Sequence, residues 1–308
     1  MLQPERQFDA EKMRASFDFH REHPDISFES HIREKRIALG DSISSLDPIY
    51  LDTRFWIFIR DAALGSPKQA AHVDLLSVLR SAVQSKKAFC PLSGASYIEL
   101  LRQAEPEKRN AIASLVDELS LGITFAAEEE RAIAELANFL YSPIFPSQLH
   151  PLRSLIWNRL PYVLGVMSPS FEWLVPAETL VAKKAFFDHL WDFSLADMVS
   201  AIQPGNPLTQ LPLEELAIRL NALNQKYSGE LKSYKQTYKR EVWGAIQPLI
   251  PHAKEIGDAI LDQMAARGLG KSDRASPSEI ERKFKDSLLE VAEKSTLSKI
   301  RFIRLQHG

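Results

Sequence analysis

The sequence predicts an α/β fold in which a small parallel sheet with flanking helices is embedded in a predominantly α-helical chain. Two short apolar runs, at 49–51 and 87–91, are typical of strands, and two helical patterns separate them. After Glu105 almost every segment has helical periodicity. Because a strand, crossover helices, a second strand and a further helix follow one another, the two strands are expected to pair in parallel.

The core of this prediction has a clear order of elements. The run at 49–51 enters Asp52, and a helical pattern then covers 54–64 until a Gly-Ser-Pro stop. A second amphipathic helix is predicted over 68–84. After the strand at 87–91, either Ser93 or Ser96 begins a helix that runs through Leu101.

Helices are also predicted before and after this core. The polar N-terminal segment has helical spacing over 11–20 and 29–43, with a His-Pro break between them. A brief strand at 122–125 is expected to rejoin the sheet, and alternating basic and apolar residues at 299–305 indicate an edge strand. The later predicted helices span 106–120, 128–141, 152–160, 178–191, 213–223, 229–246, 253–267 and 277–294.

The 308 residues are sufficient for about two ordinary domains. Changes in composition along the chain predict how it is divided. The part at 268–278 is rich in Gly and Ser, a composition typical of flexible linkers. The predicted parts are an N-terminal helical arm (1–46) packed onto the rest of the chain, the α/β core (47–126), a helical region (127–267), the linker (268–278), and a C-terminal helix with the edge strand (279–308).

Charge and cysteine content exclude several classes of protein. The net charge of −2 gives no global attraction to nucleic acid, so any phosphate-binding surface has to be local. The single cysteine, Cys90, excludes an internal disulfide framework and a multi-cysteine zinc site, and its apolar surroundings predict a buried packing residue. His150 and His189 lack a patterned partner, so neither indicates zinc. No signal peptide or apolar run of about 20 residues is present, which predicts a cytoplasmic protein without a membrane partner.

Asp52 is the first candidate for chemistry because it directly follows an apolar strand. The carboxyl ends of parallel strands are where open sheets bind ligands, and carboxylate oxygens suit Mg²⁺ or Mn²⁺. Asp is equally a favoured N-cap residue, so Asp52 alone allows either a metal ligand or a helix cap. Glu99 lies one turn into the helix that leaves the second strand, where its carboxylate can reach back to the same sheet edge.

The paired pattern resembles the PIN-like family of metal-dependent nucleases, over residues 49–104. An apolar strand enters Leu51-Asp52-Thr53, and about 45 residues later a strand is followed by Ser93 and a helix that carries Glu99. The resemblance implies that Asp52 and Glu99 are catalytic ligands of Mg²⁺ or Mn²⁺, with Thr53 and Ser93 as polar contacts to the substrate.

Arg54 departs from the small polar residue that many members of this family have at the matching position. Two interpretations of this departure remain open. The guanidinium contacts a phosphate of the substrate, or it fills the metal pocket and disables it.

The family generally uses three or four acids, so later acidic residues also matter. Asp188 and Asp192 share a helix face, and a solvated or capping role is predicted for both. Asp197 is the best candidate for a third catalytic metal ligand, although its position also fits an N-cap. Glu293 is the last acid, so the sequence does not supply the family's late strand-and-acid unit. The segment at 156–165 resembles a helical insertion of larger bacterial members.

The resulting hypothesis is a metal-dependent endoribonuclease of PIN-like type, and the resemblance implies a toxin or defence-system effector. Its predicted substrate is RNA or single-stranded DNA, with a protein partner or a second copy as further partners. The alternative is a catalytically degenerate PIN-like protein that acts as an interaction or regulatory module, which the missing late acids favour. Lys232, Lys235 and Lys239 form a row that is interpreted as either an RNA-facing surface or the solvated side of an amphipathic helix.

Overall fold

The computed structural model describes residues 10–103, 105–171, 173–201, 218–219, 221–223, 225–226, 244 and 247–268. The chain forms two compact units. The first consists of Met1–Glu128 and Arg153–Gln210, and the second consists of Glu129–Leu152 and Leu211–Gly308. This division differs from the sequence-based one because the segment after Arg153 joins the α/β core instead of the helical region that precedes it.

A two-stranded parallel sheet forms the centre of the first unit. Strand β1 (Asp47–Pro48) pairs with β2 (Ala88–Phe89), with Asp47 opposite Ala88 and Pro48 opposite Phe89. Helices α3 (Thr53–Ala63) and α4 (Ala70–Gln84) connect the two strands, and α5 (Gly94–Leu101) follows β2. The predicted order of strand, helices, strand and helix is therefore confirmed, as is the small parallel sheet within a mainly helical chain.

The first strand lies earlier than the sequence predicts. Residues 49–51 were expected to be the strand, but β1 ends at Pro48. The Ile49 amide still donates to the Phe89 carbonyl at 2.9 Å, after which the chain leaves the sheet with Tyr50 exposed and Leu51 buried. The apolar run at 49–51 therefore connects the sheet to the core beside α3. Within this run, only the Ile49 amide forms a hydrogen bond with the neighbouring strand.

A second, antiparallel pair of strands lies beside the first. Strand β3 (Ile123–Phe125) pairs with β4 (Trp157–Arg159), and a single parallel bridge joins Leu92 to Thr124. The expectation that 122–125 rejoins the sheet is therefore met only through this one bridge. The predicted helix at 152–160 and the helical insertion at 156–165 are corrected: α8 covers only Leu152–Leu155, and β4 follows it.

Aromatic packing explains why β4 is a strand. The Trp157 ring stacks on Phe125 with centroids 5.1 Å apart and meets the Phe89 ring edge at 5.2 Å. An extended backbone places Trp157 on the buried face and pairs its neighbours with β3. The 3-10 turn η2 (Leu160–Tyr162) follows, and its second residue is a proline. Because proline lacks the amide hydrogen that strand pairing needs, the strand ends here.

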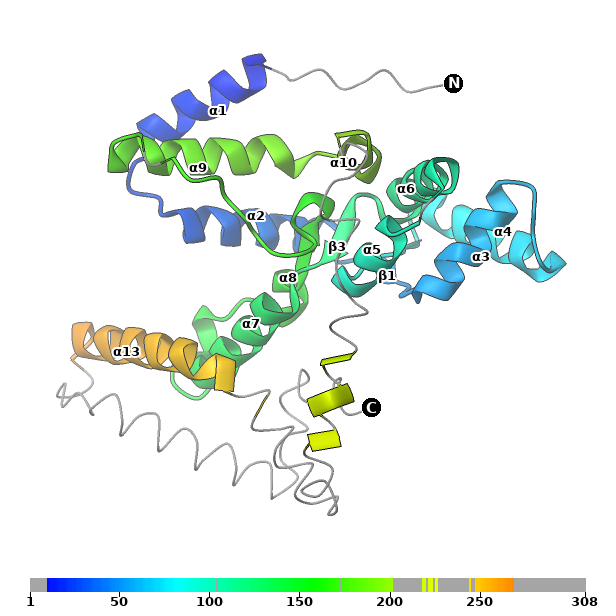
Figure 1. Cartoon of the computed structure of the whole chain (residues 1–308). Helices are drawn as coiled ribbons and strands as arrows, with labels where there is room; N and C mark the ends of the chain where they lie inside the picture. The colour runs from blue at the N-terminus through cyan, green and yellow to red at the C-terminus, as the bar shows by residue number, and fades with distance from the viewer. Residues whose placement is uncertain are drawn as a thin grey trace. The chain divides into compact units, whose positions relative to one another are not determined.

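The N-terminal helices pack against a helix that comes about 160 residues later in the chain. Helix α9 (Pro176–Trp191) lies between α1 (Ala10–Glu22) and α2 (Phe28–Ser42), as Figure 1 shows. Lys184, which is fully buried on α9, donates to two backbone carbonyls of the loop between α1 and α2, those of His23 at 3.1 Å and Ile26 at 2.9 Å. The helices expected at 11–20 and 29–43 are therefore present as α1 and α2, and α9 is their main packing partner.

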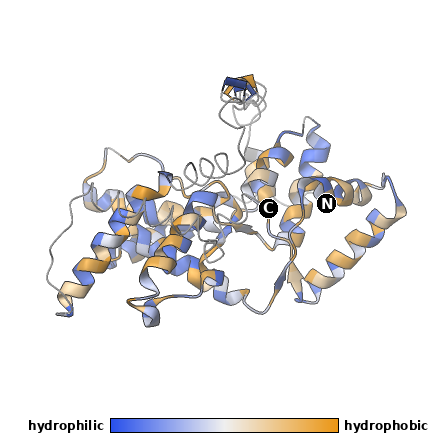
Figure 2. Ribbon diagram, turned by 90° about the horizontal axis from the view of Figure 1, so that it is seen from below, coloured by the Kyte–Doolittle hydropathy of each residue, from blue (hydrophilic) through white to orange (hydrophobic). Residues whose placement is uncertain are grey.

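Two hydrophobic cores hold the first unit together, and the mixed colouring of its helices in Figure 2 reflects their amphipathic faces. One core lies between α3, α4, α5 and α6 (Pro106–Ser120), and the other joins α2, α9 and the strands. The largest buried side chains of the two cores are Trp56, Ile59, Leu92, Leu100, Ile112, Leu119, Leu160, Phe89, Ile123, Tyr162 and Phe187.

The second unit contains α7 (Glu128–Tyr141), the 3-10 turn η1 (Pro146–Gln148), the 3-10 turn η4 (Gln247–Leu249) and α13 (Ile250–Ala266). A small apolar cluster joins α7 to α13. The predictions at 213–223, 229–246, 277–294 and 299–305, the linker at 268–278 and the lysine row lie largely or wholly outside the described residues. In the part of the chain that is described, no helix combines the length and apolar character needed to cross a bilayer.

Cys90 is fully buried after β2, which confirms the prediction of a packing residue. Burial raises the pKa of its thiol to about 11, so very little thiolate forms near neutral pH. We expect a thiol reagent at pH 8 to modify the folded protein at least about a hundredfold more slowly than the urea-unfolded chain. Equal rates in the two states would show that Cys90 is accessible.

Candidate active site

Asp52 occupies the N-cap position of α3, yet its side chain makes no capping hydrogen bond. Its backbone is extended and only its carbonyl takes part in the first turn, where it accepts from the Phe55 amide at 2.8 Å. Ser93, the N-cap of α5, behaves differently, because its hydroxyl accepts the Ser96 amide at 3.2 Å. Both cap residues come after a parallel strand. The Ser93 side chain caps its helix, whereas the Asp52 side chain does not and can take part in a site.

Asp52 and Glu99 line the same pocket at the carboxyl end of the parallel strands. The pocket has a volume of about 690 Å³, and both carboxylates are exposed to solvent. Of the six residues predicted for the site, the structure brings Asp52, Thr53, Arg54 and Glu99 together here. The complete lining consists of Asp52, Thr53, Arg54, Ile57, Phe58, Lys68, Gln69, His72 and Glu99.

A chain of hydroxyl contacts joins the starts of the two helices. The Thr53 hydroxyl donates to the Ser96 hydroxyl at 3.3 Å, and Ser93 donates to the same oxygen at 3.1 Å. The Tyr50 hydroxyl lies 3.4 Å from that of Ser93. Ser93 therefore does not line the pocket, but it helps to fix α3 and α5 so that Asp52 and Glu99 face one space.

The cations of the pocket do not neutralise its carboxylates directly. The Arg54 guanidinium carbon lies 5.2 Å from the Phe58 ring centroid, and His72 stacks on the same ring with centroids 4.2 Å apart. Within the described part of the chain, neither Asp52 nor Glu99 forms an ion pair.

The donor set of this pocket fits a hard divalent cation. Mg²⁺ and Mn²⁺ prefer oxygen ligands, and Mg²⁺ is commonly held by one or two carboxylates with water completing its shell. Asp52 and Glu99 supply two such carboxylates. Lys68 and Arg54 add positive charge to the lining of the pocket.

Asp197 lies in a different place and has a structural role. It sits in the first turn of α10 (Leu195–Ala201), where its carboxylate accepts from the Ser194 amide at 2.9 Å and from the Ser194 hydroxyl at 2.7 Å. The Ser194 hydroxyl accepts the Asp197 amide in return at 3.0 Å, which completes a reciprocal cap. Asp117 on α6 binds the next two amides of this helix. The structure therefore does not bring Asp197 into the Asp52 pocket.

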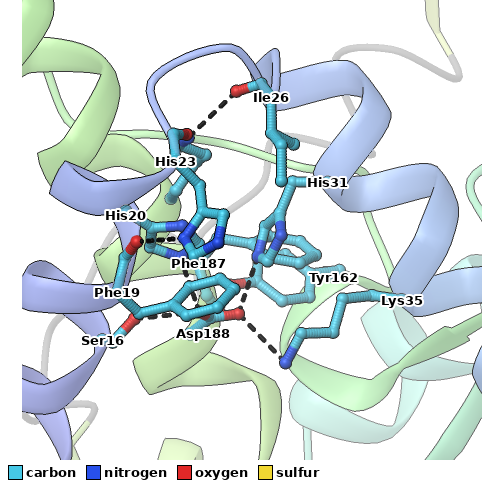
Figure 3. A network of polar contacts seen from close by, with 11 residues as sticks. Ser16, Phe19, His20, His23, Ile26, His31, Lys35, Tyr162, Phe187 and Asp188 are labelled. Carbon is cyan, nitrogen blue, oxygen red and sulfur yellow. Dashed lines mark hydrogen bonds and ion pairs between the residues drawn. The ribbon is translucent and has the colours of Figure 1, made fainter.

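Asp188 is not the solvated or capping residue that the sequence predicts. Its side chain is 15% exposed, and it accepts from His20 Nε2 and His31 Nε2, each at 2.8 Å (Figure 3). The Ser16 hydroxyl donates to it at 2.9 Å, and the Lys35 ammonium forms an ion pair with it at 3.0 Å. Burial alone would raise the pKa of this carboxyl, but the hydrogen bond from His31 and the charge of Lys35, followed by the bond from His20, hold it well below its ordinary value.

Some residues of these two sites could not be identified from the sequence. Lys68 precedes α4 and His72 lies in its first turn, and the sequence offered only two basic residues near a predicted helix start as a signal. His20 and His31 had no signal at all, because their common partner, Asp188, is more than 150 positions away. These residues meet only when α1, α2 and α9 pack together.

Comparison with known proteins adds no family assignment. No protein-family model matches the chain, and no curated protein or solved structure matches it either.

Proposed function

We propose that the protein is a metal-dependent endoribonuclease of PIN-like type, with its active site in the Asp52 pocket. One observation carries the proposal: the Asp52 carboxylate, which does not cap its own helix, lines one pocket with Glu99 beside Arg54 and Lys68. Carboxylates and cations in one open pocket are what metal-dependent phosphodiester hydrolysis needs. The choice of RNA, and a place in a toxin or defence system, rests on the family resemblance.

In this proposal Asp52 and Glu99 hold one Mg²⁺ or Mn²⁺ ion. When bound, such an ion supplies positive charge to a phosphoryl oxygen and lowers the pKa of a coordinated water. Arg54 and Lys68 bind phosphate oxygens of the strand. Because Asp52, Arg54 and Glu99 are all exposed, the site is open to a polymer as well as to a small molecule.

The first experiment measures cleavage of labelled RNA and single-stranded DNA by the full chain with Mg²⁺, with Mn²⁺ and with EDTA. We expect cleavage of RNA that requires the metal, together with binding of Mn²⁺ in a separate calorimetric titration. Cleavage that persists in EDTA would rule out the proposed chemistry. Metal-dependent cleavage of DNA alone would overturn the choice of substrate while keeping the site.

Arg54 provides a second expected result. Because its guanidinium lies over Phe58 and not on a carboxylate, the Arg54→Ala variant should bind RNA about tenfold more weakly and bind Mn²⁺ as well as the parent does. The matched control is Arg33→Ala, an exposed arginine on α2 that does not line the pocket. Tighter Mn²⁺ binding by Arg54→Ala would show instead that Arg54 blocks the metal site.

A non-catalytic interaction or regulatory module is the second candidate. The observation in its favour is that, in the described part of the chain, Asp52 and Glu99 are the only carboxylates that line this pocket, whereas the resembled family generally uses three or four. This function predicts neither cleavage nor Mn²⁺ binding by the parent protein, so cleavage and Mn²⁺ titration distinguish the two candidates.

A further inference from the structure

We propose that His20, His31 and Asp188 form a binding site for one transition-metal ion of the zinc class. The three residues come from α1, α2 and α9, and each offers a ligand atom within 4.8 Å of the other two. Both imidazoles present the same nitrogen, Nε2, to the carboxylate. This site shares no residue with the Asp52 pocket, so the two proposals stand or fall separately.

The ligand types select the class of ion. Two imidazole nitrogens and one carboxylate oxygen suit Zn²⁺, Co²⁺ and related ions, whereas Mg²⁺ prefers a set of oxygens. A tetrahedral ion with bonds of about 2.0–2.2 Å places its ligand atoms roughly 3.3–3.5 Å apart. In the present structure His20 Nε2 lies 2.8 Å from Asp188 Oδ2 and His31 Nε2 lies 2.8 Å from Asp188 Oδ1. The ligand atoms therefore have to move apart by about half an ångström to admit the ion.

The site is open on one side. His31 and Asp188 lie in the wall of a cavity of about 510 Å³, whereas His20 is fully buried behind them. Glu34, His189 and Asp192 line the same cavity and add further polar groups to it. Three protein ligands and an open side are typical of zinc sites that keep one coordination position for water or a small ligand.

Lys35 supplies a positive charge next to Asp188. Its ammonium lies 3.0 Å from Asp188 Oδ1, and its side chain is 36% exposed, so it can swing into solvent when an ion enters. The ammonium competes with the ion for the carboxylate and repels it. Removal of this charge should therefore strengthen metal binding, which is the opposite of what removal of a ligand does.

The experiment titrates the full chain, stripped with EDTA and dialysed, with Zn²⁺ by calorimetry and with Co²⁺ by visible absorption. We expect one ion per chain with micromolar or tighter affinity, and an intense Co²⁺ spectrum of low coordination number. The His31→Ala and His20→Ala variants should lose at least a hundredfold in affinity. His23→Ala is the matched control, since the His23 imidazole, just after α1, bonds to the Phe19 carbonyl and stacks on the Phe19 ring, away from Asp188, and the substitution keeps the backbone carbonyl that accepts from Lys184.

The Lys35→Met variant keeps the test informative if a ligand variant fails to fold. It should bind Zn²⁺ about tenfold more tightly than the parent, with folding checked by circular dichroism. The proposal is overturned if neither the parent nor Lys35→Met binds Zn²⁺ or Co²⁺. In that case His20, His31 and Asp188 only hydrogen-bond α1 and α2 to α9. It is also overturned if the His31→Ala variant, shown to be folded, binds as tightly as the parent.

Discussion

The Asp52→Asn and Glu99→Gln variants are each expected to lower metal-dependent RNA cleavage by more than about a hundredfold. An amide of the same shape keeps the packing but removes the charged oxygen that holds the ion, and loss of about 3 kcal/mol of transition-state stabilisation corresponds to this factor. The measurement is the initial rate of cleavage of a labelled single-stranded RNA at saturating Mn²⁺. Equal rates for the parent and both variants would place the chemistry elsewhere.

Stability and matched acids serve as controls for these variants. The Asp52 side chain makes no capping hydrogen bond, so Asp52→Asn should change the free energy of unfolding by less than about 0.5 kcal/mol. Asp74→Asn alters an exposed acid on α4 that does not line the pocket and should cleave RNA as the parent does. Asp197→Asn should lose about 1 kcal/mol of stability through its cap, and a loss of cleavage equal to that of Asp52→Asn would return Asp197 to the metal site.

The Asp188→Asn variant is expected to lose about 3 kcal/mol of unfolding free energy in the presence of EDTA. The carboxylate accepts three hydrogen bonds and pairs with Lys35, and an asparagine amide would turn a donor toward groups that are themselves donors. This is a large share of the roughly 5–15 kcal/mol by which proteins are stable. The matched control is Asp192→Asn, which alters an acid whose side chain is 47% exposed and pairs with Lys12. This variant is expected to lose less than about 1 kcal/mol of unfolding free energy.

The stability difference between the parent and Asp188→Asn should depend on pH in a defined direction. The folded state holds the pKa of Asp188 below its unfolded value of about 3.9, so the carboxylate stabilises the protein fully above that value. As pH falls below about 4 and toward the lower folded pKa, this stabilisation is lost and the difference narrows. Urea unfolding at pH 7, 4 and 3 measures it, and a difference that stays constant would contradict the assigned role.

The pairing of Asp52 with Glu99 could be predicted because its determinants are local. Asp52 directly follows one short apolar run, and Glu99 lies in the helix that follows the other. Two parallel strands joined by a crossover connection end at the same edge of the sheet, so both acids are expected there. The position of β1 was less predictable, since the buried run at 49–51 packs into the core after only one ladder bond from Ile49. Burial and strand pairing give the same apolar signal over so few residues.

Other features depend on contacts that the sequence pattern does not encode. Trp157 has an apolar neighbourhood that fits a helix, and the Phe125 and Phe89 rings, together with the pairing to β3, make the extended form preferable. Asp188 has the spacing of a solvated helix residue until α1 and α2 bring His20 and His31 against it. In both cases the decisive partner is tens to more than a hundred positions away in the chain.

The most direct test of the proposed active site is anomalous diffraction from crystals of the full chain soaked in Mn²⁺. We predict a manganese peak in the pocket that Asp52 and Glu99 line, with a carboxylate oxygen of each within about 2.0–2.6 Å of the ion. The same experiment on Asp52→Asn should show no peak there. A parent structure at saturating Mn²⁺ with no peak in this pocket, or with the same peak in Asp52→Asn, would contradict the proposed site.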